Sequence, residues 1–248
     1  MKVLDPHGAF VRHITGEGLE QYSSTGLALS PTSGNLVLIN WRTKHVTEIT
    51  VDGVVVKKFT SDEFREPTSI AVNRHGEIIV ADTGLCKLLV FDSSGKLINK
   101  IGSKGDKPGQ FRVISAVHAC GQTDEILVTD NRLQVFSRAG KFLHEIGGVN
   151  AAAAHDVSLT PGKSHSSRSA RASYCGVARD AEGNILATKT EKGKSPVVQV
   201  YTQDKRLKFE IDSFSDKLKR PSGVCIMRDG RVVVADLGND CIKVYRYC

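Results

Sequence analysis

The chain lacks long apolar runs and any spacing of residues typical of a metal site. No stretch approaches the roughly 18 consecutive apolar residues that a membrane-spanning helix needs. The opening residues, MKVLDPHGAF, contain no apolar segment of the kind found in signal peptides. We therefore expect a soluble, cytoplasmic protein. The eight histidines show no H-x-x-x-H spacing, so neither a metal nor another cofactor is expected.

Cysteines are few, and none of them forms a C-x-x-C pair. The six are Cys86, Cys120, Cys175, Cys225, Cys241 and Cys248. Most of them lie inside apolar, strand-like stretches. This placement favours buried, reduced thiols over a framework of disulfides.

A repeated phrase is the main positive feature of the sequence. Residues 67–102 read PTSIAVNRHGEIIVADTGLCKLLVFDSSGKLINKIG, and residues 221–247 read PSGVCIMRDGRVVVADLGNDCIKVYRY. The matched positions include Pro67 with Pro221, Gly76 with Gly230, and Asp82 with Asp236. A period in the forties with β-type segments is typical of a radial array of small sheets.

Each repeat is predicted to form a four-stranded antiparallel meander. In the second copy, apolar runs at 69–72, 77–82, 87–91 and 96–101 are separated by turn residues. Gly76 and Gly95 stand where the turns require positive φ, and Asp82 and Asp92 can accept hydrogen bonds from the turns that follow them. The continuous apolar runs at 78–81 and 232–235 indicate strands that are covered on both faces.

Five copies of the repeat are recognisable, and together they predict one all-β domain over 1–248, a β-propeller of four-stranded blades. The copies span about 26–59, 67–102, 114–147, 174–211 and 221–248. The last copy ends after its third strand. Residues 8–14, GAFVRHI, have the form of a fourth strand, so we expect the N-terminal strand to complete that blade and close the ring. Residues 148–173 read as an irregular insertion.

The repeats resemble the NHL-repeat β-propellers of the tripartite-motif proteins. The phrases that carry the resemblance are GSKGDKPGQF (102–111), EIIVADTGLCKLLVFDSSGK (77–96) and VVVADLGNDCIKVY (232–245). The resemblance covers nearly the whole chain. It implies a propeller that has six blades in the family, where five repeats are recognisable here.

The resemblance also implies a binding function rather than an enzymatic one. Relatives bind single-stranded RNA on a basic propeller face, or hold proteins for ubiquitination by a RING domain elsewhere in the protein. This chain lacks the closely spaced Cys and His ligands of a RING or B-box. We therefore expect no ligase activity from it alone.

A substrate-recruiting domain of a RING-type ligase is the alternative function. A propeller lyase or lactonase is a third possibility, but no convergent His, Glu and Asp residues favour it.

The formal net charge is +7, and the basic residues recur at matched places in the repeats. Basic clusters occur at 189–194 and 217–220, among others, and a basic residue precedes the first strand in four of the five repeats. The predicted binding face consists of Trp41, Arg42, Arg65, Arg112, Arg132, Arg171, Tyr174, Lys189, Lys219 and Arg220.

These residues suit single-stranded RNA or acidic protein segments as partners, whereas no membrane or DNA partner is expected. Lys and Arg side chains bind phosphates, and Trp41 or Tyr174 can stack on an unpaired base. An ordinary solvated rim of charges is the competing interpretation.

Two other features are given structural interpretations. Asp82, Asp130 and Asp236 recur at strand ends in several copies, which favours turn capping over catalysis. The tract SHSSRSARAS at 164–173 offers serines that phosphorylation can modify, each phosphate adding about −1.5 to −2 charges. A plain surface loop is the simpler interpretation of this tract.

Overall fold

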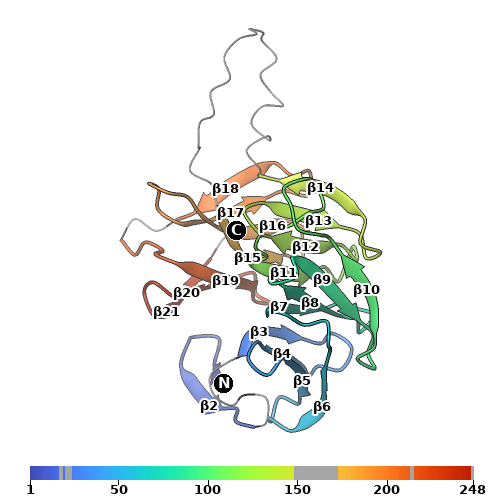
Figure 1. Ribbon diagram of the computed structural model, residues 1–248. Helices are drawn as coiled ribbons and strands as arrows, with labels where there is room; N and C mark the ends of the chain where they lie inside the picture. The colour runs from blue at the N-terminus through green and yellow to red at the C-terminus, as the bar shows by residue number, and fades with distance from the viewer. Residues whose placement is uncertain (17–18, 20–23, 148–172, 213–214, 247–248) are drawn as a thin grey trace, which may run out of the picture. The chain divides into compact units, whose positions relative to one another are not determined.

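The chain folds into β-strands joined by tight turns, and no helix occurs in the part that the structure describes. The computed structural model describes residues 1–16, 19, 24–147, 173–212 and 215–246. Five antiparallel sheets follow one another along the chain after an N-terminal hairpin (Figure 1). The prediction of an all-β protein is confirmed.

We number the sheets in chain order. The hairpin contains β1 (Lys2–Leu4) and β2 (Phe10–His13). Sheet 1 contains β3 (Ser24–Leu29), β4 (Leu36–Asn40), β5 (His45–Ile49) and β6 (Val55–Thr60). Sheet 2 contains β7 (Pro67–Val72), β8 (Ile78–Asp82), β9 (Lys87–Phe91) and β10 (Leu97–Ile101). Sheet 3 contains β11 (Ala116–Ala119), β12 (Ile126–Thr129), β13 (Leu133–Phe136) and β14 (Phe142–Ile146). Sheet 4 contains β15 (Ser173–Arg179), β16 (Ile185–Thr190), β17 (Val197–Tyr201) and β18 (Leu207–Ile211). Sheet 5 contains β19 (Pro221–Ile226), β20 (Val232–Asp236) and β21 (Cys241–Tyr245).

Sheet 2 confirms the meander predicted from the repeat. Its strands pair in the order β10–β9–β8–β7, all antiparallel. Gly76 and Gly95 have φ of 76° and 88°, as the turns require. The Asp92 carboxylate accepts hydrogen bonds from the backbone N–H groups of Ser94 at 2.8 Å and Lys96 at 3.0 Å. Local turn chemistry therefore sets the register of this sheet.

The chain forms two compact units. Unit 1 comprises Met1–Ile126 and Arg138–Lys141, and unit 2 comprises Leu127–Ser137 and Phe142–Cys248. Unit 1 contains the hairpin and sheets 1 and 2, whereas unit 2 contains sheets 4 and 5. The boundary between the units runs through sheet 3.

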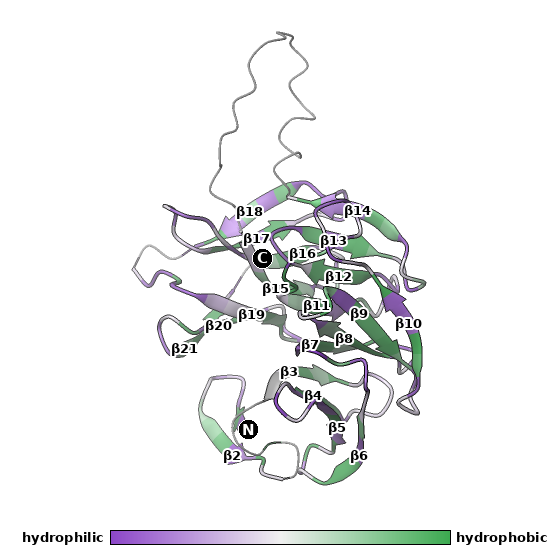
Figure 2. Ribbon diagram, viewed as in Figure 1, coloured by the Kyte–Doolittle hydropathy of each residue, from purple (hydrophilic) through white to green (hydrophobic). Residues whose placement is uncertain are grey.

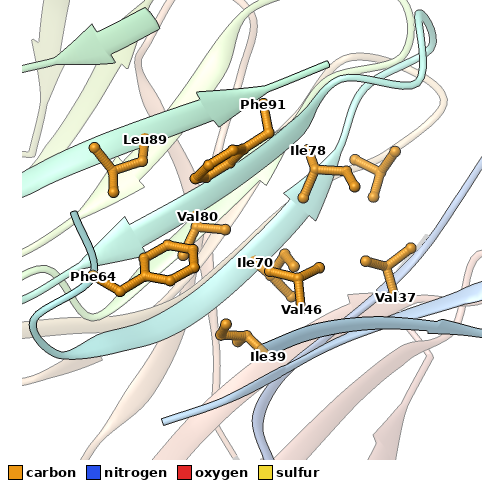
Figure 3. Close-up of a cluster of buried hydrophobic side chains, with 10 residues drawn as sticks. Val37, Ile39, Val46, Phe64, Ile70, Ile78, Val80, Leu89 and Phe91 are labelled. Atoms are coloured by element: carbon orange, nitrogen blue, oxygen red, sulfur yellow. The ribbon is translucent and has the colours of Figure 1, made fainter. Parts of the chain in front are cut away.

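An apolar cluster joins sheets 1 and 2 inside unit 1 (Figure 3). Val37, Ile39 and Val46 of sheet 1 pack with Ile70, Val80 and Phe91 of sheet 2. Phe64, from the loop before β7, lies beside Phe91 with a ring-centroid distance of 5.5 Å. In unit 2, Leu186, Val198 and Val200 of sheet 4 pack with Val232 and Val234 of sheet 5. Figure 2 shows the corresponding pattern of green strand segments separated by turns in white and purple.

Residues 8–14, which were predicted to form the fourth strand of the last repeat, contribute β2 to an N-terminal hairpin. In the structure β2 pairs with β1, and sheet 5 has three strands. The turn is local and well capped, because the Asp5 carboxylate accepts hydrogen bonds from the backbone N–H groups of His7 and Ala9 at 2.8 Å each. Closing so short a loop costs little conformational entropy. Met1, Val3 and Ile14 then pack against Ile49 of sheet 1.

The predicted state of the cysteines is confirmed in part. Cys86, Cys120, Cys175, Cys225 and Cys241 are free thiols, but only Cys86 and Cys120 are buried, and Cys225 and Cys241 are exposed. Cys248 lies outside the described residues, as do residues 148–172 of the predicted insertion. No helix in the described part is long and apolar enough to cross a membrane.

Candidate binding surface

In sheets 2 and 5, a buried aspartate at the end of the second strand holds the loop that precedes the first strand, here called the leading loop. In sheet 2, Asp82 is fully buried. Its carboxylate accepts hydrogen bonds from the backbone N–H groups of Arg65 at 2.8 Å, Glu66 at 3.0 Å and Leu85 at 3.0 Å. It therefore ties the leading loop to the β8–β9 turn, which confirms the predicted structural role.

Sheet 5 repeats this arrangement with Asp236, which is also buried. Its carboxylate accepts hydrogen bonds from the backbone N–H groups of Lys219 at 3.1 Å and Arg220 at 2.8 Å, and from the Asn239 side-chain amide at 2.6 Å. Burial raises the pKa of Asp236, but these hydrogen bonds outweigh it, and the net pKa is lowered. The aspartate therefore stays ionised and fixes the leading loop of sheet 5.

The β20–β21 turn, which follows Asp236, also packs closely against the leading loop. A Cβ added at Gly238 would lie 2.5 Å from the Lys219 Cβ and 2.9 Å from the Arg220 backbone nitrogen. Gly84 shows the same closeness in sheet 2, where an added Cβ would lie 2.9 Å from the Arg65 Cβ. Glycine is therefore required here for close packing, because real Cβ atoms do not tolerate such distances.

We expect Gly238→Ala to displace the leading loop of sheet 5 and to lower the free energy of unfolding by about 1–3 kcal/mol, the usual cost of overpacking. Urea denaturation followed by circular dichroism measures this change. Gly223→Ala in the same sheet is the matched control, because a Cβ there meets only the Ala235 Cβ, at 3.9 Å. Equal destabilisation by the two substitutions would contradict the close-packing account.

In unit 1 the predicted binding residues lie among acidic neighbours or pair with them. The Arg65 backbone is held by Asp82, but Asp62, Glu63 and Glu66 flank it in the leading loop. Arg112 forms a bidentate ion pair with Asp106. The surroundings of both residues are therefore far from purely basic.

Trp41 and Arg42 lie together on the β4–β5 turn of unit 1. Trp41 is 45% exposed, and the Arg42 guanidinium lies 5.4 Å from the centre of its ring. Asn40, which stands where the other repeats have aspartate, accepts hydrogen bonds from the backbone N–H groups of Arg42 at 3.0 Å and Thr43 at 3.1 Å. The Trp41 ring is thus exposed on this turn, and its role in binding stays a prediction.

In unit 2 two of the predicted residues are buried, and their assignment to the binding face is wrong. Tyr174 is fully buried, and its hydroxyl donates to Gln199 Oε1 at 3.2 Å. Burial is the main reason why the pKa of Tyr174 is raised. Arg132 is 9% exposed and pairs with Asp130 at 3.2 Å and Glu145 at 3.7 Å. Neither side chain can reach a ligand at the surface. Arg171 lies outside the described residues.

Lys189, at the end of β16, and Lys219 and Arg220, in the leading loop of sheet 5, all lie in unit 2, on two segments that contact each other. The Lys217 ammonium donates to the Ser195 hydroxyl at 3.3 Å, which joins the leading loop of sheet 5 to the β16–β17 turn of sheet 4. Leu218 is buried in the core between these sheets. We call residues 189–194 and 216–220 the basic loop pair.

The basic loop pair carries six cationic and two acidic side chains. The cations are Lys189, Lys192, Lys194, Lys217, Lys219 and Arg220, and the acids are Glu191 and Asp216. Glu191 pairs with Lys194 at 3.0 Å and with Lys189 at 3.5 Å, and Asp216 pairs with the buried Lys243 at 2.7 Å. Within the described part of the chain, Lys192, Lys217, Lys219 and Arg220 form no ion pair. The predicted binding face did not include Lys192, Lys194 and Lys217, although the charge clusters at 189–194 and 217–220 contain them.

The described residues contain no group of three or more His, Cys, Asp or Glu side chains placed to hold a metal ion. The basic loop pair offers the chemistry of cationic side chains. The buried side chain of Leu218 and the hydrogen bonds to the Asp236 carboxylate hold the leading loop of sheet 5. Lys217, Lys219 and Arg220 of this loop are exposed. Such a surface suits an extended polyanion.

The sequence is similar to known proteins over parts of its length. The NHL repeat family matches residues 218–245. Protein brain tumor of Drosophila melanogaster is 29% identical over 35% of this chain and 9% of its own length. B-box type zinc finger protein ncl-1 of Caenorhabditis elegans is 28% identical over 34% of this chain and 10% of its own length. NHL-repeat-containing protein 4 of Mus musculus is 36% identical over 29% of this chain and 48% of its own length. The matched stretches thus span less than half of each of these relatives.

Solved structures similar to this one include a β-propeller domain. The β-propeller domain of Cps50 (Swd1) from Myceliophteria thermophila matches 94% of this chain and 66% of its own, with a TM-score of 0.61 and 14% identity. Inactive virginiamycin B lyase from Staphylococcus aureus with quinupristin matches 98% of this chain and 76% of its own, with a TM-score of 0.64 and 12% identity. At such identities the likeness concerns the fold alone. Residues 218–245 thus match the NHL repeat, and the likeness to solved structures is to the β-propeller fold.

Proposed function

We propose that this chain is a binding module that holds single-stranded RNA along the basic loop pair of unit 2. The observation that carries the proposal is the exposure of four cations on two loops in contact, Lys192, Lys217, Lys219 and Arg220, which have no ion-pair partner among the described residues. Lys and Arg side chains on a fixed backbone follow a phosphate chain well, because each contact neutralises a phosphate and releases a counterion.

The composition of the surface predicts the kind of RNA recognition. None of the residues of the basic loop pair is aromatic, so phosphate contacts provide most of the binding free energy there and carry little sequence information. The planar guanidinium of Arg220 can stack on an unpaired base.

We expect Lys219→Glu with Arg220→Glu to weaken binding of a single-stranded RNA oligomer by at least about tenfold at low salt, because two phosphate contacts become repulsive. Fluorescence anisotropy with labelled RNA measures the affinity. The fold is expected to survive, since Asp236 holds the backbone N–H groups of these residues rather than their side chains.

The matched control is Arg65→Glu, which stands at the position of Lys219 in sheet 2 but lies among Asp62, Glu63 and Glu66. We expect it to change RNA affinity much less. If neither variant changes RNA affinity while both fold, the basic loop pair is not the RNA site. A wild-type chain that binds acidic peptides but no RNA would favour a protein partner instead.

Recruitment of proteins for a ubiquitin ligase remains the alternative function. Its support is the similarity to ncl-1, which is described as a B-box type zinc finger protein. In that role the same cations would bind an acidic segment of the recruited protein. Ubiquitination assays require a longer protein with a RING, so RNA binding by the present chain is the first test.

A further inference from the structure

A serine lies at the contact between the two segments of the basic loop pair. Ser195 follows Lys194 on the β16–β17 turn and precedes Pro196. Its hydroxyl accepts a hydrogen bond from the Lys217 ammonium at 3.3 Å. A group attached to the Ser195 oxygen would therefore lie where sheets 4 and 5 of unit 2 meet, among the cations of both segments.

The β16–β17 turn leaves room around this serine. Lys192, Gly193 and Lys194 are exposed, and Ser195 is half-buried. Gly193 has φ of 83°, and a Cβ added there would meet no atom within 4 Å. Pro196 is buried, so an enzyme that recognises the Ser-Pro pair as an extended segment needs the turn to open. Such opening stays local, because loops of exposed residues open at a low cost in free energy.

The described part of the chain contains one other Ser-Pro pair, and its environment differs. Ser30, which precedes Pro31, is 4% exposed. Its hydroxyl lies 3.1 Å from the Thr32 hydroxyl and accepts a hydrogen bond from the backbone N–H of Ser33 at 3.3 Å. Ser30 is therefore held inside its turn, and it serves as the matched control for Ser195.

We propose that Ser195 is a phosphorylation site of a proline-directed serine/threonine kinase, and that its phosphate binds Lys217 and weakens RNA binding by the basic loop pair. The effect on RNA rests on the proposed function, whereas the modification does not. In the transfer, the Ser195 oxygen attacks the γ-phosphorus of ATP, and its proton passes to a base of the kinase. The bond from that phosphorus to the β–γ bridging oxygen breaks, and ADP leaves.

The charge of the phosphate is the reason for this effect. The six cations and two acids of the basic loop pair leave an excess of four positive charges. A phosphoserine adds about −1.5 to −2 charges at neutral pH, which cancels at most about half of this excess. Its oxygens are strong acceptors for the Lys217 ammonium, which already lies at the Ser195 oxygen. The phosphate thus occupies a cation that RNA would use and repels the phosphates of the RNA.

Site-resolved mass spectrometry tests the modification. The folded chain is incubated with a proline-directed kinase and Mg-ATP, and we expect phosphate at Ser195 but not at Ser30. Absence of phosphate at Ser195 would overturn the proposal. Equal modification of Ser30 would show that the kinase acts on unfolded chains, and this result would also count against Ser195 as a site of the folded protein.

Phosphorus NMR tests the contact with Lys217. A neighbouring ammonium favours the dianionic phosphate, so the second pKa of the Ser195 phosphate should lie below that of phosphoserine in a short peptide. We expect Lys217→Gln to move this pKa toward the peptide value. Lys208→Gln is the control, because Lys208 is exposed on β18 beside the end of β17 that is remote from Ser195. The same pKa in both variants would overturn the contact.

RNA binding by the treated chain tests the final step. We expect phosphorylation to weaken binding of the single-stranded RNA oligomer by at least about tenfold at low salt, as measured by fluorescence anisotropy. Kinase treatment should leave the RNA affinity of Ser195→Ala unchanged, and an equal loss in this variant would assign the effect to another residue. A chain that binds no RNA before treatment would overturn the proposed function, while the mass spectra and the NMR titration would still decide the modification and its contact.

Discussion

Asp236→Ala is expected to lower the free energy of unfolding by about 3–5 kcal/mol, because it removes a buried charged acceptor that several donors share. The backbone N–H groups of Lys219 and Arg220 and the amide of Asn239 lose their acceptor. The buried ammonium of Lys243, 3.7 Å from the carboxylate, also loses a nearby negative charge. Urea denaturation followed by circular dichroism measures the loss.

Two variants sharpen this prediction. Asp236→Asn keeps an acceptor oxygen of the same size, and we expect it to be less destabilising than Asp236→Ala. Asp229→Ala removes a carboxylate from the same sheet whose partner is Arg231 at 2.8 Å, but this pair lies at the surface, so we expect a much smaller change. Equal effects of Asp229→Ala and Asp236→Ala would contradict the role given to Asp236.

The pH dependence of stability follows from the same aspartate. Its pKa is lowered in the folded chain from an ordinary value of 3.8, so the ionised form stabilises the fold at pH values above 3.8. That contribution falls as the pH drops below this value and is lost once the pH passes through the lowered pKa of the folded state. We expect Asp236→Asn to reduce the acid-induced loss of stability in this range, while leaving the shape of the profile between pH 6 and 8 unchanged.

Phe91→Ala is expected to lower the free energy of unfolding of unit 1 by about 3–5 kcal/mol, the usual cost of deleting a buried aromatic side chain. The Phe91 ring is buried, 5.3 Å from the Phe59 ring and 5.5 Å from the Phe64 ring. Its removal leaves a cavity beside Val80 and Leu89 in the cluster of Figure 3.

Trp41, the only tryptophan of the chain, lies in unit 1 and provides a fluorescence signal for its unfolding. Val56→Ala on β6 is the control. Its side chain is more than half exposed, so the change in stability should stay within about 0.5 kcal/mol. A Phe91→Ala variant as stable as this control would show that the cluster does not hold sheets 1 and 2 together.

The strands and turns could be predicted from the sequence because their causes are local. Gly76 and Gly95 take up positive φ in their turns, and Asp92 accepts hydrogen bonds from residues two and four positions later. The role of Asp82 was also predictable, because a turn-capping residue must recur with each repeat. Only its two additional donors, Arg65 and Glu66, come from a distant segment.

The site could be predicted only in part, because side-chain burial depends on distant neighbours. A register shift in β15 between Tyr174 and Val177 accompanies the burial of the Tyr174 ring beside Gln199 and Tyr201. Arg132 follows a short turn after β12, so that Glu145 from β14 lies within ion-pair distance. Nothing in the residues next to either side chain indicates these partners.

The apolar runs at 78–81 and 232–235 illustrate the same limit. They look alike in sequence, and both predict strands covered on two faces. β8 is buried along its whole length, whereas every second residue of β20 is only half-buried. The pattern of a strand reports its propensity for burial, but the segment that provides the cover lies elsewhere.

The salt dependence of RNA binding tests the central claim most directly. We would measure the affinity of the wild-type chain for a single-stranded RNA oligomer by fluorescence anisotropy over a range of KCl concentrations. Binding through the basic loop pair predicts that log K falls linearly with log[KCl], with a slope of about −0.7 for each phosphate neutralised. The slope should become shallower by about 1.4 in Lys219→Glu with Arg220→Glu, since two phosphate contacts are lost. No detectable binding at low salt, or a slope that the double substitution leaves unchanged, would contradict the account.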